Sequence, residues 1–488
     1  MKKLTLVICA LMLAQLIACG EADDSVDVVT TAETNGEEEE TVDDNYVPDD
    51  LPETDLNGYE FRILGFGDER FAAIWVEDQN GSIVNDAVYD KCKAVEDRFN
   101  CSIVLAEGST VGSAADTASE KTIIQTTVMS GEDSFDIASG HDITIANMTL
   151  EGLFLNILDV PYLNFEKPWW PKYTVDSLTF DGQMYMFSNS LSYNNMADTR
   201  VMYFNKTLFT DLGLEMPYSY VYDGTWTLDK LNSLTKLGYE DLNGNSMIDE
   251  EDQFGIVNAS YYYCVLEPFN LEPYQDDGKS TLTYVFDLDK YSTLTNKFYN
   301  LFFGDGGFIA TDGDASKKIF GEGRAMFTYE SLNSAVKNFS LTDLIYGILP
   351  MPKYDESQTE YYAGCTDRPC VVPITASGHL EETGLIIEAL SAEGYRKVFP
   401  AYFEQALKVR YADQTEDADM IDIINQNVIL SFTYMYGNYA SPYNKMFETL
   451  FNASTPSTDV ASYAASIEAT QQKRVAEIME VYADLKER

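Results

Sequence analysis

Positive charge is scarce in this sequence. Lys and Arg number 32 against 80 Asp and Glu, so the 488-residue chain carries a formal net charge of −48 at pH 7. Nucleic-acid phosphates are bound through basic patches, and anionic lipid surfaces attract clustered Lys and Arg. The charge balance therefore argues against nucleic acid and against electrostatic membrane binding. It favours a neutral or cationic ligand over an anionic one.

Histidine is nearly absent, and the common catalytic motifs are missing. Only His141 and His379 occur, and there is no H-E-x-x-H, G-x-S-x-G or G-x-G-x-x-G pattern. The sequence Asp277-Gly278-Lys279-Ser280 ends like a phosphate-binding loop, but Pro273 stands where its first Gly should be. The sequence therefore predicts that the protein is not an enzyme. A glycoside hydrolase stays open as an alternative, because two carboxylates suffice for that reaction.

Cysteine is also scarce, with seven residues in the chain. Cys9 and Cys19 fall in the N-terminal segment, which leaves an odd number, so at least one thiol is unpaired. The others are Cys92, Cys101, Cys264, Cys365 and Cys370. The close pair at 365 and 370 could form a disulfide in an exported protein or stay reduced. Cys92 and Cys101 are expected to be buried thiols. No spacing of the cysteines suggests a zinc site.

Long apolar runs are missing except at the N-terminus. The run from Leu4 to Ile17 follows Lys2-Lys3 and ends in Leu16-Ile17-Ala18-Cys19. It is shorter than the roughly 20 residues that span a bilayer, and its order is that of a secretory signal. We expect residues 1–18 to be a signal peptide. The end of the run resembles a bacterial lipobox, which implies a lipid on Cys19; an ordinary signal peptide is the alternative.

An acidic stretch follows the signal. Residues 20–55 contain fifteen Asp and Glu and no Lys or Arg. Such a segment buries too little apolar surface to offset its chain entropy, and its like charges keep it extended. We expect residues 19–57 to be a disordered, lipid-anchored linker that holds the body at the extracellular face of the cell membrane. An acidic tail that binds cations is the alternative.

Strands and helices alternate in the first part of the body. The apolar patterns predict strands at 60–65, 102–105 and 135–139, and helices at 86–99 and 114–130. This order is typical of βαβ units and a mainly parallel sheet. Ligands of such sheets bind beyond the carboxyl ends of the strands, which draws attention to the segments 65–69 and 139–142. The alternative is that both segments are only turns.

Aromatic residues become dense from about Pro161 to Tyr274, and further helices are predicted beyond them. Helical patterns occur at about 228–239, 291–303, 383–390 and 459–485. A body of this length corresponds to two or three domains, or to two lobes built together.

Four segments resemble one family. They are Val201-Met202-Tyr203-Phe204-Asn205-Lys206-Thr207-Leu208-Phe209, Thr225-Trp226-Thr227-Leu228-Asp229-Lys230-Leu231, Ile319-Phe320-Gly321-Glu322-Gly323-Arg324-Ala325-Met326-Phe327 and Tyr346-Gly347-Ile348-Leu349-Pro350-Met351-Pro352-Lys353-Tyr354. In this order, behind a lipobox, they resemble the substrate-binding lipoproteins of bacterial ABC importers, of family 1 and the maltodextrin-binding class.

The resemblance implies an α/β fold of the two-lobed periplasmic-binding-protein type (type II). Each lobe would be a mainly parallel sheet flanked by helices, with a hinge between the lobes. One lobe would take residues 58–163 plus 371–400, and the other 164–370 plus 401–488. The lobes of family members close around a ligand by hinge motion.

The implied function is the capture of an extracellular solute, most plainly an oligosaccharide, and its delivery to an ABC permease in the membrane. The resemblance implies a monomer, no catalytic cofactor and no nucleic-acid partner. A surface carbohydrate-binding adhesin or scaffold, uncoupled from transport, is the alternative of a different class.

The segment 241–252 has the ligand spacing of a twelve-residue calcium loop. Side-chain oxygens fall at positions 1, 3, 5, 9 and 12 and a backbone carbonyl at position 7, from Asp241, Asn243, Asn245, Asp249, Asp252 and Met247. Gly244 stands at position 4 and Ser246 at position 6, where Gly is usual, and Asp replaces the bidentate Glu at position 12. We expect a structural Ca²⁺ here, with a solvated turn as the alternative.

Aromatic residues with polar handles suit a cleft for sugar rings, which have apolar faces and hydroxyl rims. Most such rings in a protein belong to its core, so the resemblance is needed to rank them. It places Asp198 where relatives direct a carboxylate at sugar hydroxyls, and Tyr261, Tyr262 and Tyr329 at or near positions of stacking aromatics.

Three further residues are candidates for the ligand site. Asp142 follows the strand at 135–139, near the place where relatives use an Asp and an Arg; that Arg is missing here. Trp75 and Asp68 are candidates from the loop that follows the first strand.

Overall fold

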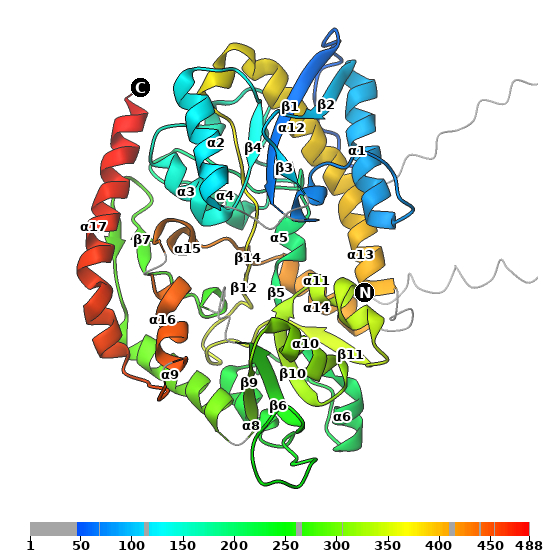
Figure 1. Cartoon of the computed structure of the whole chain (residues 1–488), viewed down its shortest axis with the longest axis vertical. Helices are drawn as coiled ribbons and strands as arrows, with labels where there is room; N and C mark the ends of the chain where they lie inside the picture. Colours follow the sequence, from blue (N-terminus) through cyan, green and yellow to red (C-terminus); the bar gives the residue numbers. More distant parts are fainter. Residues whose placement is uncertain are drawn as a thin grey trace, which may run out of the picture. The chain divides into compact units, whose positions relative to one another are not determined.

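The computed structural model describes residues 46–67, 69–111, 117–259, 266–304, 306–408, 415–438, 441–452 and 454–487 (Figure 1). The side chains of residues 69, 111 and 404–408 are not part of this description. Residues 1–18, which are predicted to be a signal peptide, Cys19 and most of the acidic stretch lie outside the described residues.

The compact body begins earlier in the chain than the boundary at residue 58. Residues 48–488 form one compact unit, separate from residues 1–47. Asp49 is buried and lies 2.8 Å from Arg98 and 3.2 Å from Arg396, while Lys167 pairs with Asp50 at 2.5 Å. These ion pairs tie the last part of the acidic stretch to the body.

The first sheet has the strand order β13-β4-β1-β2, with β3 also paired to β1. Its strands are β1 (Tyr59–Gly67), β2 (Cys101–Leu105), β3 (Thr110–Val111), β4 (Ile137–Ser139) and β13 (Cys370–Val371). The first four run parallel, and β13 is antiparallel to β4. β1 is buried along most of its length, as expected for a central strand covered on both faces.

Helices pack against this sheet in the places that the apolar patterns predict. α1 (Ile83–Phe99) buries Val84, Val88, Cys92, Val95 and Phe99, which recur every three to four residues along one face. It packs against α12 (Leu380–Glu393) and α13 (Phe399–Lys408), so helices far apart in the sequence lie side by side (Figure 1). α2 (Thr117–Ser130) and α3 (Asp142–Thr149) complete this part.

The second sheet has the order β11-β5-β10-β6-β9. Its strands are β5 (Arg200–Asn205), β6 (Phe254–Ala259), β9 (Gly307–Ala310), β10 (Ala325–Ser331) and β11 (Tyr346–Leu349). β6, β9 and β10 are parallel, and β5 is antiparallel to both of its neighbours. The carboxyl ends of the three parallel strands therefore meet the amino end of β5 at one edge.

The remaining elements surround these sheets. The helices are α4 (Lys172–Leu178), α5 (Asn194–Ala197), α6 (Lys206–Asp211), α7 (Tyr218–Tyr222), α8 (Leu228–Thr235), α9 (Leu288–Phe303), α10 (Gly313–Gly321), α11 (Asn333–Lys337), α14 (Thr415–Asn425), α15 (Phe432–Tyr436), α16 (Pro442–Phe451) and α17 (Val460–Lys486). Two small sheets pair β7 (Tyr274–Asp276) with β8 (Leu282–Tyr284) and β12 (Ala363–Gly364) with β14 (Val428–Ile429). None of the helices in the described part of the chain has the length and apolar character needed to cross a membrane.

The C-terminal helix α17 joins segments from different parts of the chain (Figure 1). It packs against α9 and β8, and the Tyr482 carbonyl accepts a hydrogen bond from Gln183 at 3.0 Å. Arg474 donates to Asn147 on α3, in the part of the body built around the first sheet. Both sheets thus belong to one packed unit, and the residue boundaries proposed for two lobes stay predictions.

The prediction that Cys92 and Cys101 are buried thiols is right for Cys92 and wrong for Cys101. The structure also answers whether Cys365 and Cys370 form a disulfide. Cys92, Cys365 and Cys370 are buried and free, whereas Cys101 is free and half-buried. Cys101 is the first residue of β2, a strand with only one buried position. Cys365 and Cys370 are therefore not bonded to each other.

Candidate functional site

A polar cavity lies at the edge of the second sheet where the carboxyl ends of β6, β9 and β10 meet. Its volume is about 650 Å³. Its lining residues come from the 3-10 turn η2 (Glu69–Ala73), from the start of β5, from the ends of β6 and β10, and from α10 and α11: Arg70, Asp198, Arg200, Asn258, Ala259, Asp312, Gly313, Asp314, Lys317, Tyr329, Glu330, Ser331, Asn333, Ser334, Lys337 and Asn338. This is the edge at which sheets of this type bind ligands.

Asp198 links the two halves of this cavity. It ends α5 just before β5, and its carboxylate lies 3.3 Å from the Arg70 guanidinium, which comes from the turn after β1. Burial raises the pKa of Asp198, while Arg70 and Arg200 oppose that rise. The predicted site residue therefore lines the cavity as one member of a charge pair, in which a solute hydroxyl can donate to the Asp198 carboxylate and accept from the Arg70 guanidinium.

Tyr329 and Glu330 line the cavity from the end of β10. Tyr329 is 6% exposed, so only a small part of its ring or hydroxyl faces the cavity. Burial raises the pKa of Glu330, while the charges of Arg200 and Lys317 oppose this. Asp198 and Tyr329 are the two sequence-predicted ligand residues that the structure brings together in this cavity.

The first turn of α10 contributes a second polar wall. Asp312 caps this helix by accepting from the backbone N–H groups of Asp314 and Ala315 at 3.0 and 2.9 Å. Lys317 lies 3.7 Å from Asp314 on the same helix. The cavity therefore holds acids and bases in similar number, although acids dominate the chain as a whole.

Asp142 occupies the carboxyl edge of the first sheet and is not among the residues that line this cavity. It begins α3, is 3% exposed, and lies 3.0 Å from Nδ1 of His141. Burial works to raise its pKa, but the hydrogen bond and charge of His141 and the Ile143 N–H lower it. Glu120 is fully buried beside it, accepts from the His141 N–H at 2.8 Å, and has its pKa raised to about 7 by burial.

Arg368 supplies the positive charge that the sequence pattern lacks near Asp142. It is 4% exposed, and its charge lowers the pKa values of Asp142, Asp198 and Glu120. Its guanidinium sits close to Gly67 at the end of β1, where a Cβ atom would come within 3.3 Å of it. Gly67 has φ +108°, a conformation suited to glycine. The charge of Arg368, just before β13, therefore acts on both predicted carboxylates.

The neighbouring Asp367 is a further buried carboxyl in this segment. Burial raises its pKa to about 7, and the charges of Asp198 and Asp142 add to that effect. Asp142 and Asp198, which lie beside different sheets, thus both raise the pKa of Asp367 in this buried segment.

Of the other candidates, only Trp75 belongs to the described residues. Trp75 is half-buried and donates its indole N–H to the Ile103 carbonyl of β2 at 3.0 Å, so it supports the first sheet and does not line the cavity. Asp68, Tyr261 and Tyr262 lie outside the described residues.

Sequence reasoning missed most of the basic residues of this region. Arg70 had a usable signal, because it stands in the loop after the first strand, two residues beyond the candidate Asp68. Arg200 stands one residue before the first family-like segment, and Lys337 belongs to a helix with no motif of its own. Arg368 was hidden in a segment that attracts attention only for its two Cys residues.

The segment 241–252 folds into a series of turns in which the three Asp side chains accept from nearby backbone N–H groups. Asp241 accepts from Gly244 at 2.7 Å and Ser246 at 2.9 Å, and Asp249 accepts from Glu251 at 3.0 Å. Ser246 adopts φ +59° at the position where calcium loops use Gly. A bridge between Glu240 and Gln253 closes the segment.

The loop side chains do not form a tight group of carboxylates. Asn243 and Asn245 both donate to Asp249, and the buried Asp252 accepts from Leu242 at 3.2 Å. Among the described residues, three acidic or histidine ligand atoms come within 4.8 Å of one another only at Asp133, Asp136 and His379.

Arg62 already pairs with both carboxylates of that group of three. Its guanidinium lies 2.7 Å from Asp133 and 3.1 Å from Asp136. The group is therefore a salt-bridge network that joins β1 to the segment before α12, and it is a poor cation site.

No protein-family model matches the chain, and no curated protein matches its sequence. Solved structures do match. The maltose/maltodextrin-binding domain MalE from Bdellovibrio bacteriovorus bound to maltotriose has a TM-score of 0.54 at 12% identity, over 86% of this chain and 100% of that chain. An ABC substrate-binding protein from Listeria monocytogenes in complex with cycloalternan has a TM-score of 0.53 at 14% identity, over 87% and 100%.

A third neighbour has a ligand of another kind. UgpB from Mycobacterium tuberculosis in complex with glycerophosphocholine has a TM-score of 0.54 at 14% identity, over 86% of this chain and 99% of that chain. These likenesses cover nearly the whole of each neighbour and show the fold. The chain has the α/β, two-lobed fold of periplasmic binding proteins, which confirms the fold class predicted from the sequence.

Proposed function

We propose that this protein is the solute-binding subunit of an ABC importer and that its solute binds in the cavity around Asp198. The observation that carries the proposal is the position of this cavity. It lies at the carboxyl edge of the second sheet, and Arg70 reaches it from the part built around the first sheet. A solute there would contact both parts of the chain, which is how binding of a small molecule can be coupled to hinge closure.

An oligosaccharide is the solute class that the cavity suits best. Its lining alternates carboxylates, amides, guanidinium groups and hydroxyls, and it includes the ring of Tyr329. Sugar hydroxyls both donate and accept, so they match such a mixed wall. Two of the structural neighbours hold oligosaccharides, and one holds glycerophosphocholine. We assign ligand contacts to Asp198 and Tyr329, and a supporting role at the first sheet to Asp142.

The proposal includes export and delivery. The predicted signal peptide and Cys19 would place the protein, as a lipid-anchored monomer, on the extracellular face of the membrane. Its partner there would be the membrane subunits of an ABC permease. Growth of cells with a radioactive fatty acid tests the anchor. We expect the unmodified protein to incorporate the label and Cys19→Ser to lose it.

A thermal-shift screen tests the solute class. A solute that binds only the folded protein stabilises it and so raises its melting temperature. The stabilisation is about 2.7 kcal/mol when the solute concentration is a hundred times Kd. We expect one oligosaccharide of a panel to do so. Asp198→Asn should weaken its binding by tenfold or more, about 1.4 kcal/mol, because a buried acceptor with charge is lost.

Glu107→Gln is the matched control, because it removes one carboxylate at an exposed position that is not part of the cavity lining. Equal binding by both variants would contradict the assignment of Asp198. Release of reducing sugar by the purified protein would instead favour a glycoside hydrolase, and binding to a polymer surface without a defined stoichiometry would favour an adhesin.

We also propose that the segment 241–252 binds a structural Ca²⁺. The support is its ligand spacing together with the turns at Asp241, Asn243, Asn245 and Asp249, in which each side chain accepts from a backbone N–H two or three residues ahead. The side-chain oxygens and the Met247 carbonyl would form the ligand set. Asp252, now turned to the Leu242 and Asp249 N–H groups, would have to exchange one of these bonds for the ion.

Calorimetry with Ca²⁺ tests this site. We expect one ion per chain, a melting temperature that falls on chelation, and loss of both effects in Asp241→Asn combined with Asp249→Asn. Glu251→Gln is the control, because position 11 is not a ligand position of such loops. Absence of calcium heat in the unmodified protein would remove the proposal.

A further inference from the structure

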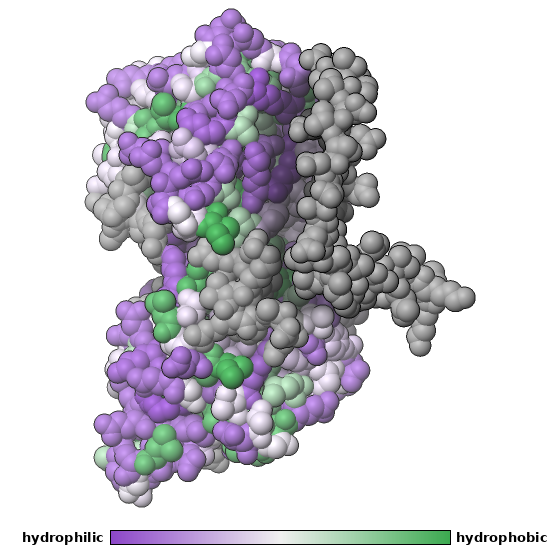
Figure 2. Space-filling view, turned by 90° about the vertical axis from the view of Figure 1, so that its right-hand side faces the viewer, coloured by the Kyte–Doolittle hydropathy of each residue, from purple (hydrophilic) through white to green (hydrophobic). Residues whose placement is uncertain are grey.

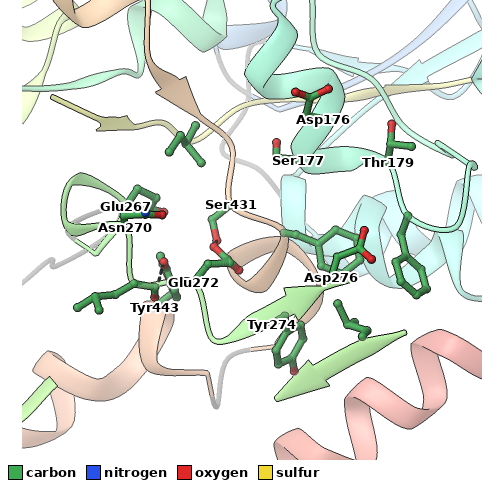
Figure 3. Close-up of a pocket in the computed structure, with 15 residues that line it drawn as sticks. Asp176, Ser177, Thr179, Glu267, Asn270, Glu272, Tyr274, Asp276, Ser431 and Tyr443 are labelled. Atoms are coloured by element: carbon green, nitrogen blue, oxygen red, sulfur yellow. Dashed lines mark hydrogen bonds between the residues drawn. The ribbon is translucent and has the colours of Figure 1, made fainter. Parts of the chain in front are cut away.

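A second cavity, of about 200 Å³, lies beside the η4 turn (Glu267–Phe269) and shares no residue with the cavity around Asp198. It is enclosed by α4, by the segment 267–282 and by the start of α15 (Figure 3). Its lining residues include four acids and no Lys, Arg or His. Asp176 and Asp276 are exposed at its rim, whereas Glu267 and Glu272 lie inside.

Glu267 is the unusual member of this group. It is 2% exposed, and among the described residues no hydrogen-bond partner reaches either of its carboxyl oxygens. Buried polar groups are nearly always hydrogen-bonded, because leaving one unpaired costs the full free energy of its desolvation. A buried carboxyl without a partner, on the wall of a cavity, points to a missing partner that carries a positive charge or a donor.

Glu272 is fixed in place beside it. Its carboxylate accepts from Ser431 Oγ and from the Thr433 N–H, both at 2.7 Å. Figure 3 shows Glu272 and Ser431 pointing toward one another, with Glu267 on the neighbouring turn. Ser431 also accepts from the Tyr434 N–H at 3.0 Å and so caps α15. The second carboxylate is therefore held rigidly by α15.

The other walls are aromatic. Phe180 and Phe432 have ring centroids 6.2 Å apart, and Tyr274 and Tyr443 complete the lining. The two Tyr hydroxyls bond elsewhere, Tyr274 to Gln471 at 2.5 Å and Tyr443 to the Leu271 carbonyl at 2.7 Å. Their rings therefore offer apolar and π surface to the cavity, with no hydroxyl donor left for Glu267.

We propose that this cavity binds a small organic cation, of the alkylammonium class, with Glu267 as its counter-ion and the aromatic rings around its alkyl groups. Carboxylates and aromatic faces together recognise such cations. A bare divalent metal fits less well, because apolar rings supply no ligand and no third acidic ligand atom lies close to these two among the described residues.

Cation binding at Glu267 is linked to a proton. Burial raises the pKa of Glu267 to about 8, and the charge of Glu272 adds to the rise, while the nearby backbone N–H groups of Glu267 and Leu266 and the charge of Arg200 oppose it. A cation binds the ionised carboxylate, so the proton must leave first. Affinity should rise about tenfold per pH unit up to about pH 8 and level off above it.

The test uses choline and its neutral isostere 3,3-dimethyl-1-butanol in titration calorimetry on the full mature chain, between about pH 6 and pH 9. We expect choline to bind with affinity that rises with pH, and the isostere to bind at least about thirtyfold more weakly because it leaves the carboxylate unpaired. Failure of choline to bind the unmodified protein at about pH 9 would overturn the proposal.

Variants locate the site. Glu267→Gln should abolish choline binding and its pH dependence, whereas Glu107→Gln, an exposed charge outside the lining, should leave both unchanged. Circular dichroism and the unfolding transition show whether Glu267→Gln is folded, and Phe432→Leu, which keeps the carboxylate but removes a ring, should weaken binding several-fold. Choline binding that survives in folded Glu267→Gln, or an isostere that binds as tightly as choline, would refute the assignment.

Discussion

Lys206 and Asp417 show how a single residue of a recognition motif serves the fold. The Lys206 ammonium lies 2.8 Å from Asp417, and both side chains are almost fully buried. Asp417 also accepts from the Tyr218 hydroxyl at 2.7 Å and from the Ile348 N–H at 3.0 Å. One carboxylate on α14 thus joins the end of β5 to β11.

Asp417→Asn should destabilise the protein by about 3–5 kcal/mol, because it removes the buried counter-charge that lies 2.8 Å from the Lys206 ammonium. Asp419→Asn on the same helix is the control. Asp419 accepts from the exposed Tyr222 hydroxyl, so the substitution should cost about 1 kcal/mol or less. Urea unfolding measures both. A similar loss in the two variants would contradict the role given to the buried pair.

At the scale of elements, Glu388 on α12 holds the segment before α4. The Trp169 and Trp170 indoles donate to its two carboxyl oxygens at 2.9 and 2.8 Å. Burial raises the pKa of Glu388 to about 7, and the two indole donors oppose this. The two adjacent tryptophans and Glu388 thus form a structural clamp.

Glu388→Gln should cost about 1–3 kcal/mol, because an amide has one acceptor oxygen and leaves one buried indole N–H unpaired. Glu381→Gln, exposed in the first turn of the same helix, should change stability by less than about 0.5 kcal/mol. Chemical unfolding followed by Trp fluorescence compares them, and an unchanged midpoint for Glu388→Gln would show that the clamp contributes nothing.

The four segments that suggested the family meet one another in the structure, which explains why they are informative about the fold. Asn205 caps α6 and donates to the Gly323 carbonyl at 3.0 Å. The Trp226 indole donates to the Pro350 carbonyl at 2.9 Å, and Lys353 bonds the Trp226 carbonyl. These residues build the second sheet and its surroundings, so their order along the chain predicts the architecture well.

The same segments predict less of the candidate site. Local patterns predicted the helix that became α1 and the strand that became β1, because burial imposes a period on the sequence. The cavity depends on long-range juxtaposition: Arg70 meets Asp198, and Arg368 arrives beside Asp142 from a distant segment. No local period marks such meetings, and only Asp198 and Tyr329 were placed through the resemblance.

At the scale of the whole molecule, an excess of acid is combined with several buried carboxyls. The face in Figure 2 is mostly hydrophilic, with scattered apolar residues. In the interior, burial raises the pKa values of Glu120, Glu272, Asp367 and Glu388 to about 7 and that of Glu267 to about 8. In the unfolded chain these groups titrate near 4.

The protein should therefore be more stable at mildly acidic pH than at alkaline pH. Acids whose pKa is raised by folding bind more protons in the folded state between about pH 4 and pH 8, so the free energy of unfolding falls as pH rises through that window. Calorimetry should show a melting temperature higher by about 5 °C or more at about pH 5.5 than at about pH 8.5. A melting temperature that rises over this interval would contradict the account.

The central claim is that a solute binds between Arg70, Asp198 and Tyr329. A crystal structure with the oligosaccharide that gives the largest thermal shift tests it most directly. We expect electron density for one sugar chain in this cavity, with hydroxyls within hydrogen-bond distance of Asp198. Density for the bound solute at any other place, with this cavity holding only water, would contradict the claim.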